Sequence, residues 1–297
     1  MKIVIVGSEG FVGKELKKHC RTKNIEVITI DSVPSDDPNH ILTDIRSNEI
    51  ESVIPHHADA LVHLAAISRV EECRTNPQLA FDVNVLGTLN LIRAAQKCGT
   101  RQFIFASSEW VYGEIIDGSL QTEEQAIDAT KIQSEYALSK IVGEQALKLA
   151  YMLDFCPVTI VRFGIVYGPR SANWSAVESL FEAVRTEKAV VVGSLATARR
   201  FIHVSDVAEG ISAVIGRTGY EVFNLSGDNL ITLRDIIDHS SQLLGRRPEV
   251  RETDPSSVSI RNPDNRKARS ILGWAPAMSL NDGLMTLMES SDGLEHA

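Results

Sequence analysis

A tyrosine and a lysine four positions apart, Tyr136 and Lys140, could together carry out proton transfer. On a helix this spacing places both side chains on one face, so that the ammonium can lie near the phenol. An unperturbed tyrosine has a pKa of about 10 and is a poor base at neutral pH, but a neighbouring cation favours the phenolate. The same spacing is common in surface pairs, so the surrounding motifs must decide between acid–base chemistry and a solvated pair.

Two serines, Ser107 and Ser108, follow an apolar run at 103–106 that is predicted to form a strand. Open α/β sheets bind ligands beyond the carboxyl ends of their strands, and a hydroxyl there can both donate and accept hydrogen bonds. A turn-forming Ser-Ser pair is the other interpretation. The position makes both serines candidates for contact with a ligand.

Three glycines, Gly7, Gly10 and Gly13, lie between the first predicted strand and the helix that follows it. Glycine is needed where the backbone turns tightly and where a diphosphate must approach main-chain N–H groups at a helix N-terminus. A second predicted strand, 26–30, ends at Asp31, where an acidic residue would bind the adenosine ribose hydroxyls; a loop or capping role is the alternative. A carboxylate repels a 2′-phosphate, so the pattern favours NAD over NADP.

The elements that must position these residues can be predicted from the hydrophobic pattern. Short apolar runs bounded by loops recur at 3–6, 27–30, 60–64, 103–106 and 158–162, with segments of helical spacing between them. This alternation predicts a parallel sheet covered on both faces, so we expect an α/β protein with a doubly wound sheet of the Rossmann type.

The longest helical pattern extends from 76 to 99, where apolar residues recur three and four positions apart. We expect one long amphipathic helix there, ended by Gly99. The pattern loosens after residue 165. We therefore predict an NAD-binding domain at 1–165, to which a segment near 200–226 returns, and a smaller substrate-binding domain at 166–297.

The composition excludes several classes of protein. The 297 residues carry 30 Lys and Arg against 39 Asp and Glu, a net charge of −9 without a basic block, so we expect no nucleic acid partner. The four cysteines are far apart, which indicates reduced thiols. No stretch approaches the roughly 20 apolar residues that span a bilayer. We expect a soluble, cytoplasmic protein with no membrane association, and we predict no metal site.

A longer series of motifs, met in order along the chain, resembles one protein family. The series comprises Gly7-x-x-Gly10-Phe11-Val12-Gly13, His63-Leu64-Ala65-Ala66, Asn84 with Gly87-Thr88, Ser107-Ser108 before Val111-Tyr112-Gly113, Tyr136-x-x-x-Lys140, Arg162 before Tyr167-Gly168-Pro169-Arg170, Phe201-Ile202-His203-Val204-x-Asp206-Val207 and Leu272-Gly273-Trp274-x-Pro276. Together they resemble the extended short-chain dehydrogenase/reductases, specifically the NAD-dependent epimerase/dehydratase family of sugar-nucleotide enzymes. The resemblance extends over nearly the whole chain.

The resemblance implies roles for the matching residues. Tyr136 would be the catalytic acid/base, Lys140 would bind the nicotinamide ribose and lower the pKa of the tyrosine, and Ser108 would hydrogen-bond the reacting sugar hydroxyl. Asn84 would help to order the active site; a surface amide on its helix is the alternative. A homodimer built on the helices that carry Asn84 and Tyr136 is also implied. The residues expected to contact NAD are Gly7, Gly10, Phe11, Val12, Gly13, Asp31, Asp44, Ile45, Leu64, Ala65, Ala66, Asn84, Ser107, Tyr136 and Lys140.

The substrate side departs further from the family pattern. Arg199 matches a phosphate-binding arginine, and Arg251 with Asp254 resembles a pair that holds the phosphate and ribose of a nucleotide. Solvated surface charge is the other interpretation of both arginines. Glu109 lies where the 4,6-dehydratases carry an acidic proton donor, but Trp110 replaces their second acid. We therefore expect Glu109 to be a polar contact of the substrate.

The leading hypothesis is an NAD-dependent sugar epimerase, specifically a nucleotide-sugar 4-epimerase. Hydride would pass transiently to NAD, and a keto-sugar intermediate would turn over and accept it on the other face. The alternative is a net oxidoreductase, either a keto-sugar reductase or a sugar dehydrogenase, that uses the same residues. A 4,6-dehydratase and a non-catalytic NAD-binding regulator are less favoured. Because the diphosphate is an anion, we expect the cations Lys140, Arg199 and Arg251 to face the cleft.

Overall fold

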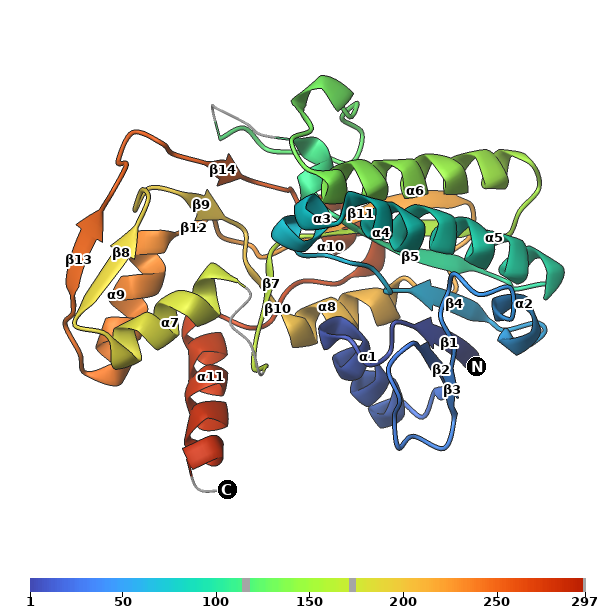
Figure 1. Ribbon diagram of the computed structural model, residues 1–297, viewed down its shortest axis with the longest axis horizontal. Helices are drawn as coiled ribbons and strands as arrows, with labels where there is room; N and C mark the ends of the chain where they lie inside the picture. The colour runs from blue at the N-terminus through green and yellow to red at the C-terminus, as the bar shows by residue number, and fades with distance from the viewer. Residues whose placement is uncertain (114–117, 171–174, 296–297) are drawn as a thin grey trace.

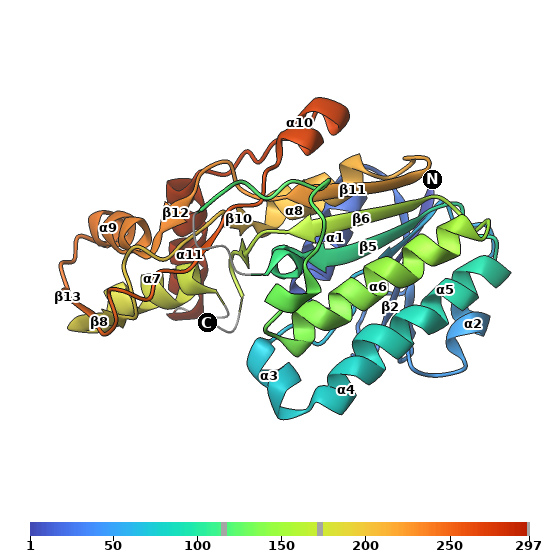
Figure 2. The same ribbon diagram turned by 90° about the horizontal axis from the view of Figure 1, so that it is seen from above.

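The computed structural model of the chain describes residues 1–113, 118–170 and 175–295, which form a layered body and a smaller lobe beside it (Figure 1). Seen from above, the body is a sheet with helices on both of its faces, and the lobe extends from one end (Figure 2). No helix in these residue ranges is both long and apolar enough to cross a membrane.

In the described part of the chain, the central sheet has seven parallel strands in the order β11-β6-β5-β4-β1-β2-β3. They are β1 Lys2–Val6, β2 Glu26–Asp31, β3 His40–Leu42, β4 Ala60–His63, β5 Phe103–Ser108, β6 Val158–Phe163 and β11 Tyr220–Leu225. Strands β4, β5 and β6 are buried along their whole length, because helices cover both faces of the sheet. The predicted doubly wound Rossmann fold is therefore confirmed.

The strand order reverses between β1 and β4, and ligands of open α/β sheets bind in the crevice at such a point. The helices that cover one face are α1 Phe11–Thr22, α8 Val204–Ala213 and α10 Arg266–Leu272, and those on the other are α2 Ile50–Val53, α5 Gly87–Lys97 and α6 Glu135–Met152. Each layer packs its apolar side chains on the sheet, so the body has one core on each face. The connections include shorter helical segments: α3 Val70–Thr75 after β4, η2 Glu109–Tyr112 directly after β5, and η3 Ala129–Lys131 before α6.

The helical segment predicted at 76–99 is present, but a wider turn divides it. It consists of α4 Pro77–Phe81, a π-helical turn at Asp82–Leu86, and α5. Helix α5 ends at Lys97, and Gly99 follows with a φ of 64°, as expected of a helix-ending glycine. The spacing of the apolar residues did not reveal this turn, in which the hydrogen bonds join residues five apart.

The smaller lobe has a core of its own, formed by side chains that include Phe181, Ile236 and Leu284. Its helices are α7 Ala176–Thr186, α9 Leu233–Leu244 and α11 Leu280–Glu295. Its strands are short: β8 Ala189–Val192 pairs with β13 Glu249–Glu252, and β9 Ala198–Arg199 lies between β12 Ile231–Thr232 and β14 Ile260–Arg261. A further pair, β7 Val166–Tyr167 with β10 Ile202–His203, joins the lobe to the body.

The chain returns from the lobe to the body more than once. Helix α8 and strand β11 both lie in the segment near 200–226, which is predicted to return to the body. Residues of α10 and the following loop do so as well, because Ala268 and Trp274 are buried in the core under α8. The indole N–H of Trp274 donates to the backbone oxygen of Asp206 at 3.2 Å. The division of the chain into two domains at residue 165 stays a prediction.

Candidate active site

The glycine turn between β1 and α1 brings the backbone closer to its neighbours than a side chain allows. Gly7 has a φ of 88°, and a Cβ added there would lie 2.7 Å from the Cα of Ala65. A Cβ added at Gly13 would overlap the Gly7 carbonyl oxygen and lie 2.8 Å from the Cα of Ser8. The first turn of α1 has Gly10 as its N-cap, with no side-chain cap and no acidic residue. Its backbone N–H groups can therefore donate hydrogen bonds to an anion.

The end of β2 and the loop after β4 both contact this turn. The carboxylate of Asp31 accepts the backbone N–H of Glu9 at 2.8 Å and that of Val33 at 3.0 Å, which leaves further lone pairs on its oxygens. The N–H groups of Leu64 and Ala65 both donate to the carbonyl of Val6, at 2.8 and 3.0 Å. Asp31, Leu64 and Ala65, which are predicted to contact the cofactor, thus meet at the carboxyl edge of the sheet. Ala66, also predicted, follows Ala65 directly.

The other predicted cofactor residues have well-defined neighbours. Phe11 begins α1, and the guanidinium of Arg170 lies 4.2 Å from the centre of its ring. Val12 packs against the core under α8. The Asp44 carboxylate accepts the Arg46 Nε–H on one oxygen at 3.0 Å and the Arg46 Nη2–H on the other at 2.6 Å. Ile45 is buried among the helices, and its side chain lies against Gly87.

Tyr136 and Lys140 lie one turn apart on α6, as the spacing predicts, and the Lys140 ammonium is 5.8 Å from the centre of the tyrosine ring. Lys140 is 3% exposed, and its Nζ donates to the Ala106 carbonyl of β5 at 2.8 Å. Burial lowers the pKa of Lys140 to about 8, although the nearby carboxylate of Glu144 raises it. The ammonium is therefore held against the strand that ends in Ser108.

The Tyr136 phenol lies beside the Ser108 hydroxyl. Burial raises the pKa of Tyr136 to about 12, and hydrogen bonding with Ser108 opposes this rise. Ser108 also caps the η2 turn by accepting the backbone N–H of Trp110 at 3.3 Å. With its pKa raised, the phenol is protonated at neutral pH, and a base role requires additional positive charge nearby.

Ser107, predicted to contact the cofactor, takes part in a buried polar network. Its hydroxyl donates to Glu144 on α6 at 2.5 Å, and Arg162 of β6 binds the same carboxylate with Nε at 3.0 Å and Nη2 at 2.7 Å. Arg162 also donates to the Tyr112 hydroxyl at 3.0 Å. The network joins β5, β6 and α6, and its residue on α6, Glu144, lies one helical turn after Lys140. The sequence analysis missed Glu144, although its position four residues after Lys140 places both on one helix face.

Asn84 lies inside the π-helical turn and is 2% exposed, so it is not a surface amide. Its side chain accepts the Ile67 N–H at 2.8 Å and donates to the Ile67 carbonyl at 2.9 Å and to the Ser139 hydroxyl at 3.0 Å. These bonds connect the loop after β4 with α6, at a position between Tyr136 and Lys140. The amide therefore fixes the loop after β4 against α6, and its part in ordering an active site stays a prediction.

On the substrate side, Glu109 is fully buried at the start of η2. Within the described part of the chain, neither oxygen of its carboxyl group has a hydrogen-bond partner. Burial raises the pKa of Glu109 to about 7, whereas the nearby guanidinium groups of Arg261 and Arg199 lower it. Arg261, from β14, stacks on the ring of Trp110 at 3.7 Å. No motif in the sequence pointed to Arg261, because its partners are remote along the chain.

Arg199 and Arg251, both predicted to bind the phosphates of a substrate, lie in different places: Arg199 is on β9 and Arg251 is on β13. Arg199 lies close enough to Glu109 to influence it, and its guanidinium donates to the Ser259 carbonyl at 2.5 Å and to the Ser259 hydroxyl at 2.9 Å. Arg251 is on β13 at the outer edge of the lobe, where it is exposed and paired with Glu249 (Figure 1). Asp254, also exposed, accepts the Ser256 hydroxyl at 2.8 Å. A nucleotide contact by Arg251 and Asp254 stays a prediction.

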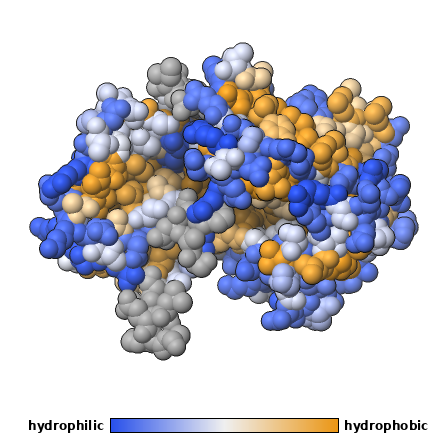
Figure 3. All heavy atoms as spheres, viewed as in Figure 1, coloured by the Kyte–Doolittle hydropathy of each residue, from blue (hydrophilic) through white to orange (hydrophobic). Residues whose placement is uncertain are grey.

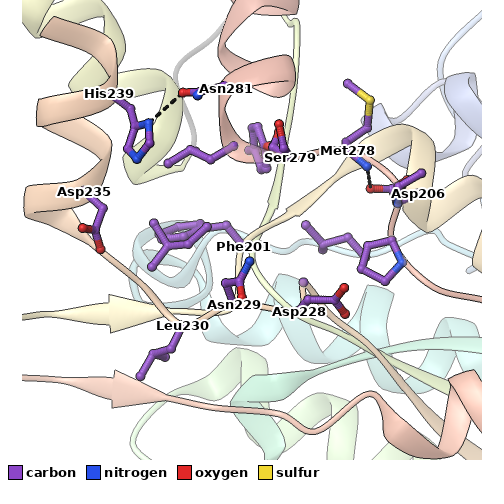
Figure 4. Close-up of a pocket in the computed structure, with 17 residues that line it drawn as sticks. Phe201, Asp206, Asp228, Asn229, Leu230, Asp235, His239, Met278, Ser279 and Asn281 are labelled. Atoms are coloured by element: carbon purple, nitrogen blue, oxygen red, sulfur yellow. Dashed lines mark hydrogen bonds between the residues drawn. The ribbon is translucent and has the colours of Figure 1, made fainter. Parts of the chain in front are cut away.

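A separate cavity of about 500 Å³ lies between α9 and the segment before α11 (Figure 4). Its ionisable side chains already have partners: Asp206 accepts the N–H groups of Ala277 and Met278, and His239 is hydrogen-bonded to Asn281. None of the predicted catalytic or cofactor residues lines it. We therefore assign the site to the strand ends near Ser108 and not to this cavity.

Comparisons with known proteins agree with this geometry. Residues 3–226 match the model of a family described as the NAD dependent epimerase/dehydratase family. A UDP-glucuronate 4-epimerase of Thermodesulfobacterium geofontis is 28% identical, over 80% of this chain and 73% of that protein. A putative UDP-glucose 4-epimerase of Methanocaldococcus jannaschii is also 28% identical, over 95% of each chain. The solved structure of MoeE5 with UDP-glucuronic acid and NAD is 26% identical, covers 99% of this chain and all of that one, and has a TM-score of 0.87.

Proposed function

Because the chain belongs to the NAD dependent epimerase/dehydratase family, we propose that this NAD-dependent enzyme is a nucleotide-sugar 4-epimerase. The observation that carries the proposal is the meeting of Tyr136, Lys140 and Ser108 at the end of β5, on the same edge of the sheet as the glycine turn. The relatives named UDP-sugar 4-epimerases support the substrate class and the reaction.

The residues around the glycine turn fit NAD. The open N–H groups at the start of α1 suit the diphosphate, and the closeness of Gly7 to Ala65 leaves the turn bare of side chains. The remaining lone pairs of Asp31 suit the ribose hydroxyls. When bound, NAD supplies a reversible two-electron oxidant for the sugar carbon.

The chain's own side chains position the sugar and move its proton. Ser108 orients the reacting hydroxyl, and Tyr136 removes the proton from it and later returns it. Lys140 binds the nicotinamide ribose, with its ammonium 5.8 Å from the centre of the phenol ring, and the oxidised nicotinamide would add the further positive charge that the phenolate requires. Asn84 acts as a positioning residue, since it fixes Ser139 between Tyr136 and Lys140. Arg199 binds the diphosphate of the substrate.

The second candidate is a net oxidoreductase, a keto-sugar reductase or sugar dehydrogenase, which would use the same three residues. The two functions differ in whether the cofactor is released in a changed redox state. A 4,6-dehydratase is less favoured, because Trp110 provides no carboxyl group beside Glu109.

Incubation with UDP-sugars and dTDP-sugars tests the proposal. Nicotinamide absorbance and product stereochemistry are followed together, and we expect the 4-epimer to form without net NADH. Stoichiometric NADH with an oxidised sugar would support the oxidoreductase instead. Tyr136→Phe is expected to reduce turnover by about 100- to 10,000-fold, since the acid–base group is lost, with NAD binding retained. Tyr151→Phe, a partly exposed tyrosine on the same helix, is the control and should keep full activity.

We also propose that the enzyme is a homodimer that works in the cytoplasm. The face formed by α5, α6 and the π-helical turn supports the dimer, because it exposes the large apolar side chains Leu86, Leu89, Leu138, Leu149 and Met152. Figure 3 shows hydrophobic atoms gathered over α5 and α6. The four cysteines are unpaired thiols, which suits a reducing compartment.

A further inference from the structure

Arg170 connects the start of helix α1 in the body with the start of helix α7 in the lobe. It lies three residues after β7, in the chain segment that leads into the lobe. Its guanidinium is 4.2 Å from the centre of the ring of Phe11, the first residue of α1. The same guanidinium donates from Nε to the carboxylate of Glu178 on α7 at 2.7 Å, and its Nη2 lies 2.6 Å from that carboxylate. One side chain therefore contacts both parts of the molecule.

This contact is closely packed and largely shielded from water. The side chain of Arg170 is 14% exposed, and that of Glu178 is 4% exposed. The Glu178 carboxylate also accepts the N–H of Gly168 at 3.3 Å and that of Ser175 at 2.8 Å, which fixes its position. Gly168 has a φ of 148°, and a Cβ added there would lie 3.3 Å from Cζ of Phe11. The backbone after β7 thus lies against the Phe11 ring, as the Arg170 side chain does.

The chemistry of arginine suits this position better than that of lysine. A planar guanidinium can lie over an aromatic ring while its N–H groups bind a carboxylate, whereas an ammonium is a compact point charge. Both interactions gain strength where water is excluded. The ring of Phe11 is therefore held toward the lobe at the first residue of α1.

We propose that Arg170 is a positioning residue for NAD, which holds the start of α1 against the lobe and thereby increases the affinity for the cofactor. The inference rests on the proposed function, because it takes the glycine turn as the NAD site. It gives the lobe, predicted to bind the substrate, a part in holding the cofactor as well. Phe11 directly follows the N-cap Gly10, so a shift of its ring would displace the N–H groups that suit the diphosphate. Placing those groups before NAD binds reduces the cost of ordering them.

Two single variants and their combination test the proposal: Arg170→Lys and Phe11→Leu. Lysine retains the positive charge beside Glu178 but loses the planar guanidinium, and leucine retains an apolar side chain but loses the ring. We expect each single change to weaken NAD binding by at least about fivefold, measured by calorimetric titration of the NAD-free full chain. The combined variant should bind within about twofold of the weaker single variant, because both residues act through one contact.

Hydrogen–deuterium exchange of the NAD-free chain separates positioning from general stability. We expect faster exchange at residues 7–16 in both single variants and unchanged exchange at 158–163, because the contact holds the start of α1 and not strand β6. A purely structural role would raise exchange in both segments and lower the thermal midpoint, with the NAD affinity of the folded protein unchanged. Arg246→Lys alters an exposed arginine of the lobe, and this control should match the parent in every measurement.

Other results would also overturn the inference. These are an unchanged NAD affinity in either single variant, or losses that add in the combined variant. A third variant, Arg170→Met, addresses a direct effect of charge: if it weakens NAD binding while Arg170→Lys binds as the parent does, the charge acts on the cofactor itself and the positioning role is wrong.

The proposed function is judged separately, by NAD binding and epimer formation in the unmodified enzyme. An unmodified chain that does not bind NAD would contradict both the function and the inference. Normal NAD binding in the Arg170 and Phe11 variants would contradict the inference alone.

Discussion

At the scale of single residues, the environment of Lys140 links structure to activity most directly. Its side chain is almost fully buried, yet its proposed role requires a positive charge. Burial disfavours the ammonium and lowers its pKa to about 8, while the carboxylate of Glu144 one turn further along α6 favours it. Glu144 is itself held by Arg162 and Ser107, so the buried network keeps this carboxylate where it favours the ammonium of Lys140.

The pKa of Lys140 predicts an alkaline limit to activity. Below about pH 8 the side chain carries its proton, and above it the charge is lost. We therefore expect kcat/KM to decrease by up to about tenfold per pH unit as the pH rises beyond about 8. Lys140→Met should have low activity at every pH, whereas Lys148→Met, an exposed lysine of the same helix, should keep the profile of the parent. A kcat/KM that stays flat from neutral pH to about pH 10 would contradict the assignment.

At the scale of elements, the turn between β1 and α1 tolerates the least change. Gly13 lies in the first turn of α1, where its Cα faces the Gly7 carbonyl and the Ser8 backbone. Any larger residue would push the helix away from the strand, and with it the N–H groups that suit a diphosphate. The close packing of helix on strand thus sets the geometry of the cofactor site.

Gly13→Ala should therefore weaken NAD binding by at least about tenfold and destabilise the fold by about 1–3 kcal/mol, because the added methyl group overlaps fixed backbone atoms. The dissociation constant is measured by titration with NAD and the stability by urea unfolding. Gly193→Ala is the matched control: a Cβ at Gly193 has no atom within 4 Å, and both quantities should match those of the parent. Unchanged affinity in Gly13→Ala would show that the turn can adapt.

At the scale of the whole molecule, the chain passes repeatedly between body and lobe, and this brings residues of the lobe to the end of β5. The paired strands β7 and β10 lie at this junction, and Arg199 and Arg261 approach Glu109 from the lobe. Because the lobe extends from one end of the body, helices α5 and α6 stay uncovered along the side of the body (Figure 2). Their exposed apolar side chains define the face on which the proposed dimer forms.

The dimer can be tested by placing charge on that face. Leu89→Glu combined with Leu149→Glu should give particles with the mass of one chain in analytical ultracentrifugation, because each exposed leucine would lie against the partner helices. The unmodified protein should have the mass of two chains. Leu42→Glu alters an equally exposed leucine on the edge strand β3, and it should leave the dimer intact. A monomeric unmodified protein would contradict the proposal.

Much of the fold and part of the site could be predicted because their signals are local. The glycines before α1, Asp31 at the end of β2 and the Tyr136–Lys140 spacing each depend on a single turn or helix, and the alternation of strands with helices depends on periodicity. The predicted family, the Rossmann fold and the NAD cofactor are confirmed. The assignments of individual site residues stay predictions that the experiments above test.

What the sequence by itself determined is therefore the alternation of strands and helices and the family, and it predicted the chemistry at the strand ends. Only the tertiary structure decided which charged groups meet. Arg261 packs on the Trp110 ring near Glu109. Ser107 and Arg162 both donate hydrogen bonds to Glu144. Arg251 pairs with Glu249 at the outer edge of the lobe. The physical reason is that spacing along a chain encodes neighbours within one element, whereas contacts between remote segments depend on how separate elements pack.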